Sequence, residues 1–152
     1  MTYWLMKSEG DTYPIDALQK KKVDAWDGVR NYQARNFMKE MQVGDVVLFY
    51  HSAGRPNGIY GLAKVAKKAY PDQSQFDAKS EYYDRKATQE KPIWYCVDVA
   101  FVKKFSHPVT LEVIKADRKL EGMRVRERGS RLSVQPVSDE HFIYIRDGLG
   151  GQ

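Results

Sequence analysis

The sequence predicts one α+β domain built around a curled, mostly antiparallel β-sheet. Its 152 residues suffice to bury a core without a metal ion or a disulfide. A hydrophobic share of 42% and a charged share of 30% are typical of a globular protein. Short strand-like runs are interspersed with short helices but do not alternate regularly with them, which argues against a parallel doubly wound sheet. Because we find no repeat, low-complexity tract or long linker, we expect a single domain over residues 1–152.

The first elements are a strand at 2–7 and a short helix that begins at Pro14. Proline suits the first helical position, where its missing N–H would have no partner. Asp16 at the start and lysines at 20–22 at the end match the helix dipole. A loop around Trp26 then leads to a second helix, in which apolar residues recur at helical spacing: Ala34, Phe37, Met38 and Met41.

A buried strand is expected at 46–50, because the run Val-Val-Leu-Phe-Tyr is apolar on both faces. The following residues, 52–58, are dense in turn formers. They predict a connection to a partner strand at 59–65.

The second half of the chain begins with a long polar stretch at 70–91, which is expected to be an irregular excursion from the domain. The clearest strand is at 93–102, where apolar residues alternate onto one face. Thr110 is expected to cap a short helix and Ser138 a last one, with a short strand at 131–134 between them.

The net charge of +5 and the pI of about 9.2 favour a polyanionic partner. Residues 115–131 concentrate this charge, with seven cations against three acids. Most of these cations are arginines, which suit bidentate phosphate contacts.

Several classes of protein are disfavoured by composition. No apolar run approaches the roughly 20 residues that span a bilayer, and no signal-peptide pattern is present. We therefore expect no membrane association and a cytoplasmic location, or a nuclear one if the source is a eukaryote. Cys96 is the only cysteine, so neither an intrachain disulfide nor a CxxC metal site can form. Its strand-like surroundings indicate a small buried hydrophobe.

The block Trp26-Asp27-Gly28-Val29-Arg30-Asn31-Tyr32-Gln33-Ala34-Arg35-Asn36 is the most informative part of the sequence. It places an aromatic ring, a carboxylate, amides and arginines next to a glycine. This composition is typical of a pocket wall that stacks on a flat ring and hydrogen-bonds its edge, and a nucleobase is such a ring.

This block and several others resemble the EVE domain family, over about residues 3–145. The other blocks are YWLMKSE at 3–9, VGD at 43–45, FYHS at 49–52 and GSRLSVQPV at 129–137, with weaker matches at 69–72, 82–84 and 94–99. The resemblance implies a PUA-like fold, a small barrel-like sheet flanked by short helices, related to the YTH domains. It also implies binding of a modified cytosine or a related modified base in an aromatic pocket, without catalysis. Gly10 stands where the family usually has proline, which loosens the loop beside the expected pocket.

The residues expected to form the base-binding pocket are Lys7, Ser8, Trp26, Asp27, Gly28, Val29, Asn31, Tyr50, His51, Ser52, Leu132, Ser133, Val134 and Gln135. Trp26 is the candidate stacking ring, with a core position as the alternative, whereas Trp4 and Trp94 are expected in the core. Asp27 has the polarity to accept a hydrogen bond from cytosine N4, and its alternative is an Asx turn.

Two further pocket residues have equally ordinary alternatives. Asn31 either contacts the base edge or caps the second helix. Ser8 either contacts the base edge or caps the end of its strand.

The phosphates that flank the base are expected to contact Arg30, Arg35, Arg128 and Arg131, which would position the polymer without reading its sequence. His107 and His141 are expected to be structural. The scattered histidines and the absence of spaced carboxylates predict no metal site and no cofactor.

The favoured function is therefore a non-catalytic reader of a flipped-out modified base, with a 5-substituted cytosine in DNA as first choice. An RNA reader of PUA or YTH type is the alternative, and a stand-alone reader of either kind would need an effector protein as a further partner. A hydrolase using His51 with a serine or Asp27 is less favoured, because neither a G-x-S-x-G elbow nor a phosphate-cradling loop is present. An interaction domain with no ligand would leave the polar groups around Trp26 unused.

Overall fold

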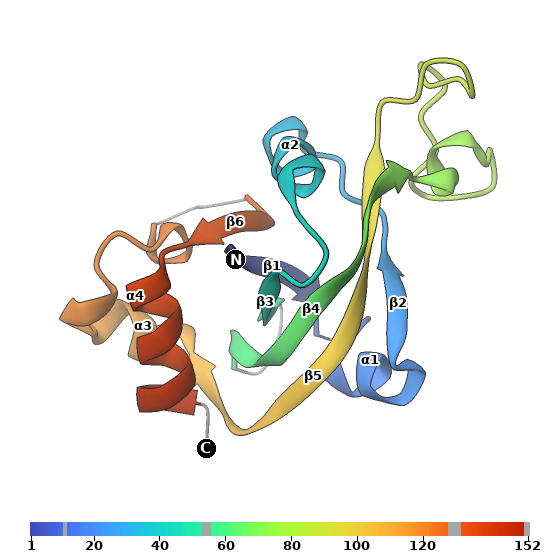
Figure 1. Ribbon diagram of the computed structural model, residues 1–152. Helices are drawn as coiled ribbons and strands as arrows, with labels where there is room; N and C mark the ends of the chain where they lie inside the picture. The colour runs from blue at the N-terminus through green and yellow to red at the C-terminus, as the bar shows by residue number, and fades with distance from the viewer. Residues whose placement is uncertain (11, 53–55, 128–131, 151–152) are drawn as a thin grey trace.

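The computed structural model describes residues 1–150 except 11, 53–55 and 128–131, and shows a six-stranded mixed sheet (Figure 1). The strand order is β2-β5-β4-β3-β1-β6. The strands are β1 (Tyr3–Glu9), β2 (Val23–Trp26), β3 (Val46–Ser52), β4 (Gly58–Pro71), β5 (Tyr95–Thr110) and β6 (Val134–Val137). The α-helices are α1 (Ile15–Lys21), α2 (Tyr32–Glu40), α3 (Leu111–Ala116) and α4 (Asp139–Ile143). Tighter 3-10 turns at Gln73–Phe76, Arg118–Leu120 and Arg124–Arg126, and a π-helical turn at Tyr144–Gly150, complete the chain.

The predicted α+β fold with a mostly antiparallel sheet is confirmed. Among the described strands, β1 and β3 form the parallel pair, with Tyr3 opposite Val46, and the other pairings are antiparallel. Register shifts along β4 and β5 mark bulges, which bend these two long strands across the sheet (Figure 1). The sheet curls without closing, because β2 and β6 lie at its two edges.

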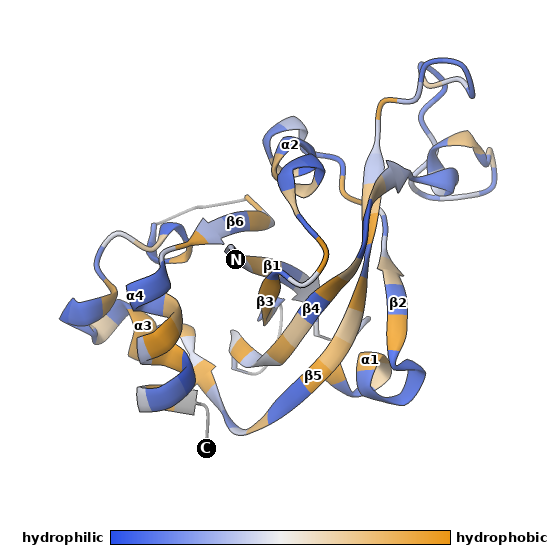
Figure 2. Ribbon diagram, viewed as in Figure 1, coloured by the Kyte–Doolittle hydropathy of each residue, from blue (hydrophilic) through white to orange (hydrophobic). Residues whose placement is uncertain are grey.

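Apolar residues pack on both faces of the sheet. On one face, Trp4, Met6 and Phe49 join a cluster that includes residues of α1 and α2. On the other face, Leu5 and Leu48 join a cluster that includes Ile114 of α3 and Phe142 of α4. Figure 2 shows the corresponding pattern, with hydrophobic colour along the strands and hydrophilic colour on the outer helix surfaces. This two-sided burial explains why residues 46–50 are apolar at every position.

Two local predictions near the N-terminus are wrong. Pro14 is the N-cap of α1 and not its first helical residue, because its backbone is extended, with ψ at 162°. Trp26 does not lie in a loop but ends the edge strand β2, where it pairs with Val97 of β5. Only Trp26 is buried in this four-residue strand, so no apolar pattern marks it in the sequence.

Later elements are confirmed in type but shifted in extent. Strand β4 continues to Pro71 and β5 to Thr110, well beyond the predicted ends at 65 and 102, and β5 begins at Tyr95 and not at residue 93. The strand expected at 131–134 is β6, at Val134–Val137. Both predicted caps are present, since the Thr110 and Ser138 hydroxyls accept hydrogen bonds from backbone N–H groups of α3 and α4.

The polar excursion is a folded segment held by one buried amide. Gln75 is fully buried; its side-chain oxygen accepts from the N–H groups of Ile93 and Trp94, and its amide nitrogen donates to the carbonyls of Asp72 and Trp94. The Trp94 indole N–H donates to Asp84 at 2.9 Å, which ties the far part of the segment to β5. The segment is therefore positioned relative to the sheet. As predicted, Trp4, Trp94 and Cys96 are buried.

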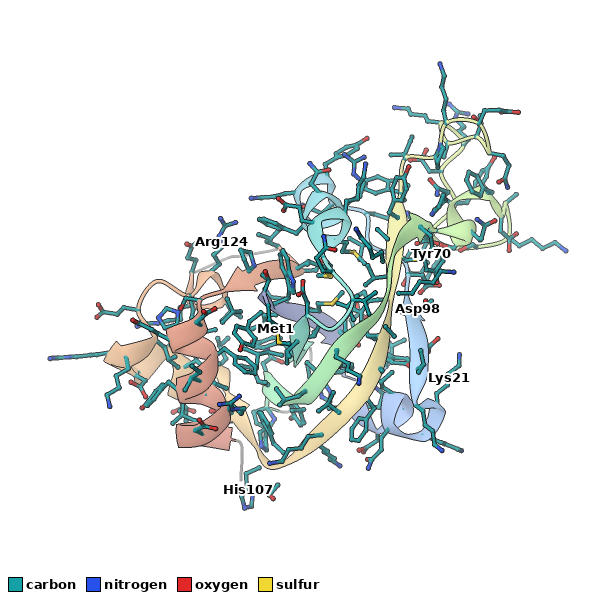
Figure 3. The ribbon with its side chains drawn as sticks, in the orientation of Figure 1. Met1, Lys21, Tyr70, Asp98, His107 and Arg124 are labelled. Atoms are coloured by element: carbon teal, nitrogen blue, oxygen red, sulfur yellow. The ribbon has the colours of Figure 1, made fainter. Side chains whose placement is uncertain are left out.

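Tyr70 and Asp98 show how β4 and β5 are joined near this segment. The Tyr70 hydroxyl donates to the Asp98 carboxylate across the two strands, and the two residues lie near each other in Figure 3. Within the described residues, no helix is long and apolar enough to cross a membrane.

Candidate functional site

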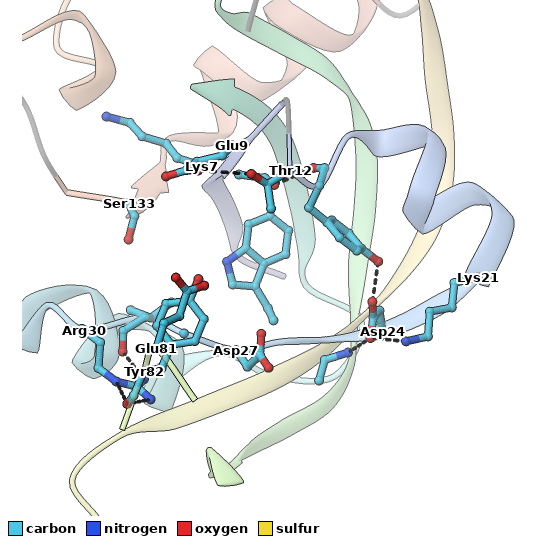
Figure 4. A pocket seen from close by; sticks show the side chains of 16 residues that line it. Lys7, Glu9, Thr12, Lys21, Asp24, Asp27, Arg30, Glu81, Tyr82 and Ser133 are labelled. Atoms are coloured by element: carbon cyan, nitrogen blue, oxygen red, sulfur yellow. Dashed lines mark hydrogen bonds and ion pairs between the residues drawn. The ribbon is translucent and has the colours of Figure 1, made fainter. Parts of the chain in front are cut away.

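A cavity of about 660 Å³ opens beside the C-terminal end of β2, within the size range of small-molecule sites. Its walls come from the end of β1, the turn into α1, residues 24–30 and the excursion (Figure 4). The lining residues are Lys7, Ser8, Glu9, Thr12, Tyr13, Lys21, Asp24, Ala25, Trp26, Asp27, Gly28, Val29, Arg30, Glu81, Tyr82 and Ser133. In Figure 4, Arg30, Glu81 and Tyr82 lie on one side of the cavity and Lys7 and Glu9 on the opposite side.

Trp26 belongs both to the core and to the cavity wall. Only 9% of its surface is exposed, and its ring meets Phe49 edge-on at a centroid distance of 5.3 Å. The pairing of β2 with β5 fixes its backbone. The two roles weighed for Trp26 are thus compatible in position, with most of the indole packed and the remainder lining the cavity.

Gly28 allows Tyr82 to close over the wall. Its φ is +80°, in the region that favours glycine, and an added Cβ would lie 2.7 Å from the Tyr82 ring. Tyr82 itself is 37% exposed, so its ring is shared between the wall and solvent.

Arg30 and Asp72 hold this wall together. The buried Asp72 carboxylate accepts from the Gly28 N–H at 2.8 Å and from the Arg30 guanidinium at 3.2 Å. Arg30 also donates to the Tyr82 carbonyl, at 2.8 and 3.0 Å, and to the Ser74 hydroxyl. Burial opposes ionisation of Asp72, but hydrogen bonds from Ser74, the Gly28 amide and Arg30 outweigh it and lower its pKa. Arg30 is expected at a phosphate, but its guanidinium N–H groups donate to the Tyr82 carbonyl and so position Tyr82.

The cavity carries charged groups of both signs. Burial lowers the pKa of Lys7, while burial and the nearby Asp72 charge raise the pKa of Asp27. Tyr13 donates its hydroxyl to Asp24, which also pairs with Lys21 at 3.0 Å; burial and the Asp24 contact raise the Tyr13 pKa. A polar ligand would therefore meet both hydrogen-bond donors and acceptors here.

The structure brings together half of the predicted pocket. The predicted pocket residues that line the cavity are Lys7, Ser8, Trp26, Asp27, Gly28, Val29 and Ser133, and Arg30 of the predicted phosphate contacts lines it as well. The predicted pocket residues that are not in its lining are Asn31, Tyr50, His51, Ser52, Leu132, Val134 and Gln135.

Most residues outside the lining have structural contacts. Asn31 caps α2, since its side chain accepts from the Ala34 N–H at 2.9 Å. Tyr50 and Val134 are buried in the two core clusters. Gln135 donates to the Leu132 carbonyl at 2.7 Å, which braces the chain before β6.

The two serines near the end of β1 are also engaged. The Ser8 hydroxyl donates to the Tyr13 carbonyl at 2.6 Å, so Ser8 holds the turn into α1 while it lines the cavity. The Ser52 hydroxyl donates to the Ser8 carbonyl at 3.2 Å.

His51 is committed to the start of α1. It is 5% exposed, its Nε2 accepts from the Ile15 N–H at 3.0 Å, and its ring stacks on Tyr60 at 3.8 Å. Burial lowers its pKa. The nitrogen lone pair that a general base would use thus has a partner, and the lining of the cavity does not include His51.

The other histidines lie away from the cavity. His107 is exposed at the bend of β5 (Figure 3), and His141 lies in α4. Among the residues that the structure describes, no three potential metal ligands come together.

Of the other predicted phosphate contacts, the described residue Arg35 is not in the cavity lining. Arg35 donates to the Ile93 carbonyl at 3.0 Å and to its neighbour Asn36. Arg128 and Arg131 lie outside the described residues. In the described part of the basic segment, Arg124 lies over Phe37 and Arg126 donates to the Lys115 carbonyl.

Several lining residues were not predicted from the sequence. No sequence pattern marks Tyr13 or Asp24 as a site residue. Asp24 lies in β2, which has no apolar pattern, and Tyr13 precedes α1 and contacts Asp24. Glu81 and Tyr82 come from the excursion, and the signal for Tyr82 was its place in the block 82–84 that resembles the EVE family.

Comparison with known proteins gives consistent matches over nearly the whole chain. The EVE domain model matches residues 2–147. Mouse thymocyte nuclear protein 1 is 40% identical, over 94% of this chain and 71% of its own length. A crystal structure of human THYN1 protein in complex with 5-methylcytosine containing DNA superposes with a TM-score of 0.90 at 36% identity, covering 95% of each chain. A protein of Pseudomonas syringae superposes with a TM-score of 0.91 at 47% identity, covering 94% of this chain and 96% of its own.

Proposed function

The chain belongs to the EVE domain family, and from this premise we propose that it binds DNA and holds a flipped-out 5-substituted cytosine in the cavity at the end of β2. 5-Methylcytosine is the first candidate. The observation that carries the proposal is the cavity itself, walled by Trp26 and Tyr82, in a chain whose human relative has been crystallised with 5-methylcytosine containing DNA.

The walls match what a flipped base needs. Extruding a base from its stack costs a few kcal/mol, and stacking on an aromatic ring returns about 1–3 kcal/mol per base. Trp26 and Tyr82 both contribute rings to the lining, and Tyr82 lies so close to Gly28 that a Cβ added there would be 2.7 Å from its ring. The indole is already fixed by Phe49, so little side-chain freedom is lost when a base enters.

The polar groups favour a base that carries an amino group. The Asp27 and Glu81 carboxylates line the cavity and have the polarity to accept from cytosine N4. The Lys7 ammonium lines it as a donor for a ring carbonyl oxygen. Thymine presents a carbonyl where cytosine has its amine, so we expect thymine to bind more weakly.

The role is binding and not turnover. His51 is held by Ile15 and Tyr60 outside the lining. A reader of this kind acts where its DNA is, in the cytoplasm of a prokaryote or the nucleus of a eukaryote, and passes the signal to an effector protein.

The test is a fluorescence anisotropy titration with labelled oligonucleotides that differ at one position. Cytosine, 5-methylcytosine, 5-hydroxymethylcytosine and thymine are compared in DNA, with matched RNA strands as a second arm. We expect about a tenfold preference for a 5-substituted cytosine, which corresponds to about 1.4 kcal/mol.

The diagnostic variant is Tyr82→Ala, and Tyr83→Ala is its control. Tyr83 is a neighbouring, 45% exposed tyrosine that is not in the cavity lining. Tyr82→Ala should abolish the preference, whereas Tyr83→Ala should keep it. Trp26→Ala is less informative, because removing a core tryptophan costs about 3–5 kcal/mol of stability. Equal affinity for all bases that Tyr82→Ala leaves unchanged would refute the proposal. If the preference were found only in the RNA strands, RNA and not DNA would be the ligand.

A further inference from the structure

The outer face of α2 carries an aromatic and basic stripe next to the cavity. Ala34 and Met38 are buried on the inner face of this helix. Tyr32, Arg35 and Lys39 follow one another at spacings of three and four residues, which places them along one side of the helix, with Asn36 next to Arg35. Tyr32 is 57% exposed.

The Tyr32 ring packs against a buried aromatic ring. Its ring stacks on the buried Trp94 at 4.8 Å, with an interplanar angle of 29°. The Arg35 guanidinium carbon lies 4.9 Å from the Tyr32 centroid and 5.9 Å from that of Trp94. Tyr32 remains 57% exposed beside the guanidinium of Arg35. Hydrogen bonds to the Ile93 carbonyl and to Asn36 hold Arg35 in this place.

A row of stacked groups connects Tyr32 with the cavity wall. The Arg30 guanidinium lies 5.4 Å from the ring centroid of Trp94 and 5.4 Å from that of Tyr82. Tyr82 lines the cavity and Trp94 supports Tyr32. The cavity wall and Tyr32 are therefore linked by a row of contacting side chains that runs through the buried Trp94.

We propose that Tyr32, Arg35 and Lys39 form a second nucleotide subsite, where a base that flanks the flipped one stacks on Tyr32. Aromatic rings bind every base through its π-face, so this contact is insensitive to sequence. Arg35 and Lys39 supply positive charge for the adjoining phosphates, and Lys39 is placed by its contact with the Tyr95 ring at 4.7 Å. The subsite rests on the proposed function, since the base in the cavity brings its neighbour to α2. It contributes affinity, while the cavity contributes the choice of base.

The experiment compares wild type, Tyr32→Ala and Tyr32→Phe on three ligands. The ligands are a labelled oligonucleotide with one 5-methylcytosine, the same strand with abasic sites on both sides of it, and the free nucleoside 5-methyl-2′-deoxycytidine. Binding to the two strands is followed by anisotropy and to the nucleoside by calorimetry. Thermal melting of each variant checks that it is folded.

Tyr32→Ala should weaken binding of the intact strand by roughly 5- to 100-fold. It should leave the ratio of 5-methylcytosine to cytosine affinity and the nucleoside affinity unchanged. The abasic strand should bind wild type and Tyr32→Ala equally, and Tyr32→Phe should behave as wild type. Lys39→Gln, an exposed position, should reduce the salt dependence by about one phosphate contact, a slope change of roughly 0.7–0.9.

Wild-type affinity of Tyr32→Ala for the intact strand would overturn the subsite, and so would a parallel loss for the nucleoside. The two proposals fail separately. If wild type shows no preference among bases but Tyr32→Ala still weakens DNA binding, the subsite stands and the base-reading cavity fails. If the preference depends on Tyr82 but Tyr32→Ala changes nothing, the subsite alone fails.

Discussion

The Tyr82 ring lies over Gly28 so closely that any Cβ at residue 28 would come within 2.7 Å of it. This contact joins two segments more than 50 residues apart and decides the shape of the cavity wall. It depends on a glycine with positive φ at the end of β2 and on the hydrogen bonds that bring Tyr82 there from the excursion.

Gly28→Ala should therefore weaken ligand binding about as much as Tyr82→Ala does. The methyl group displaces the ring, and positive φ adds about 1 kcal/mol of backbone strain. Anisotropy and thermal melting measure the two effects. The matched control is Gly44→Ala, because Gly44 has φ of +94° but nothing within 4 Å of an added Cβ. Gly44→Ala should lose stability alone, and full affinity in Gly28→Ala would contradict the role of this contact.

Binding of 5-methylcytosine should weaken as pH falls, at a higher pH than an ordinary aspartate would cause. The ionised Asp27 accepts the amine hydrogen bond, and burial together with the Asp72 charge raises the Asp27 pKa, so protonation begins earlier. Titrations from about pH 8 down to about pH 4, near the ordinary aspartate pKa, measure the effect. Asp27→Asn should bind more weakly at neutral pH and lose this part of the pH dependence. Identical pH profiles for wild type and Asp27→Asn would remove Asp27 from the recognition.

Gln75→Leu should destabilise the protein by about 3 kcal/mol or more. The replacement has a similar size but leaves the Ile93 and Trp94 N–H groups without a partner, whereas the Asp72 and Trp94 carbonyls each keep a backbone hydrogen bond. Each buried unsatisfied group costs about 1–3 kcal/mol. Urea denaturation measures the change in free energy of unfolding, and limited proteolysis should cut the excursion first. Gln73→Leu serves as control, because Gln73 is exposed and donates only to the Pro71 carbonyl. Equal stability of the two variants would disprove the anchoring role.

The free energy of unfolding should decrease as pH falls through the ordinary histidine range, in part because of His51. Burial lowers the His51 pKa below its usual value of 6.5, so the unfolded chain takes up a proton before the folded one does. The contribution of His51 to the free energy of unfolding is complete above pH 6.5 and declines as the pH falls below that value. His51→Gln retains an acceptor for the Ile15 N–H but does not titrate, so its melting temperature should fall less between about pH 7 and about pH 5.5. The exposed His107→Gln should follow wild type, and parallel curves for all three proteins would exclude this effect.

The strands in the middle of the sheet were predictable because their burial requires local runs of apolar residues. Val46 to Tyr50 are apolar throughout, since both faces of β3 are covered. Strand β2 was not predictable in this way. Three of its four residues are exposed or half-buried, and its conformation comes from pairing with β5, where Trp26 meets Val97. Hydrogen-bond pairing with a neighbouring strand produces no recognisable sequence pattern in a strand this short.

The candidate site likewise has a part that local sequence predicts and a part that depends on distant contacts. Residues 26–30 form one wall because they are consecutive, and their unusual composition pointed to a site. Tyr82 joins this wall from the excursion, and the positions of Arg30, Asp72 and Gln75 that hold it there depend on contacts between distant segments. His51 shows the converse case. It follows the apolar run at 46–50, as a ligand-binding residue can, but it lies within β3 and its Nε2 accepts from the Ile15 N–H at the start of α1.

The pairing of β1 with β6 has a consequence for biosynthesis. Tyr3 lies opposite Val137, so β1 pairs with a strand that is synthesised more than 130 residues later. Until β6 emerges, one edge of β1 presents unpaired backbone groups beside apolar side chains, which is a template for association with other chains. Such long-range pairing also slows folding, because a large loop must close before the contact forms. The protein is thus exposed to aggregation during synthesis, and the last step in completing its sheet is also the step that protects it.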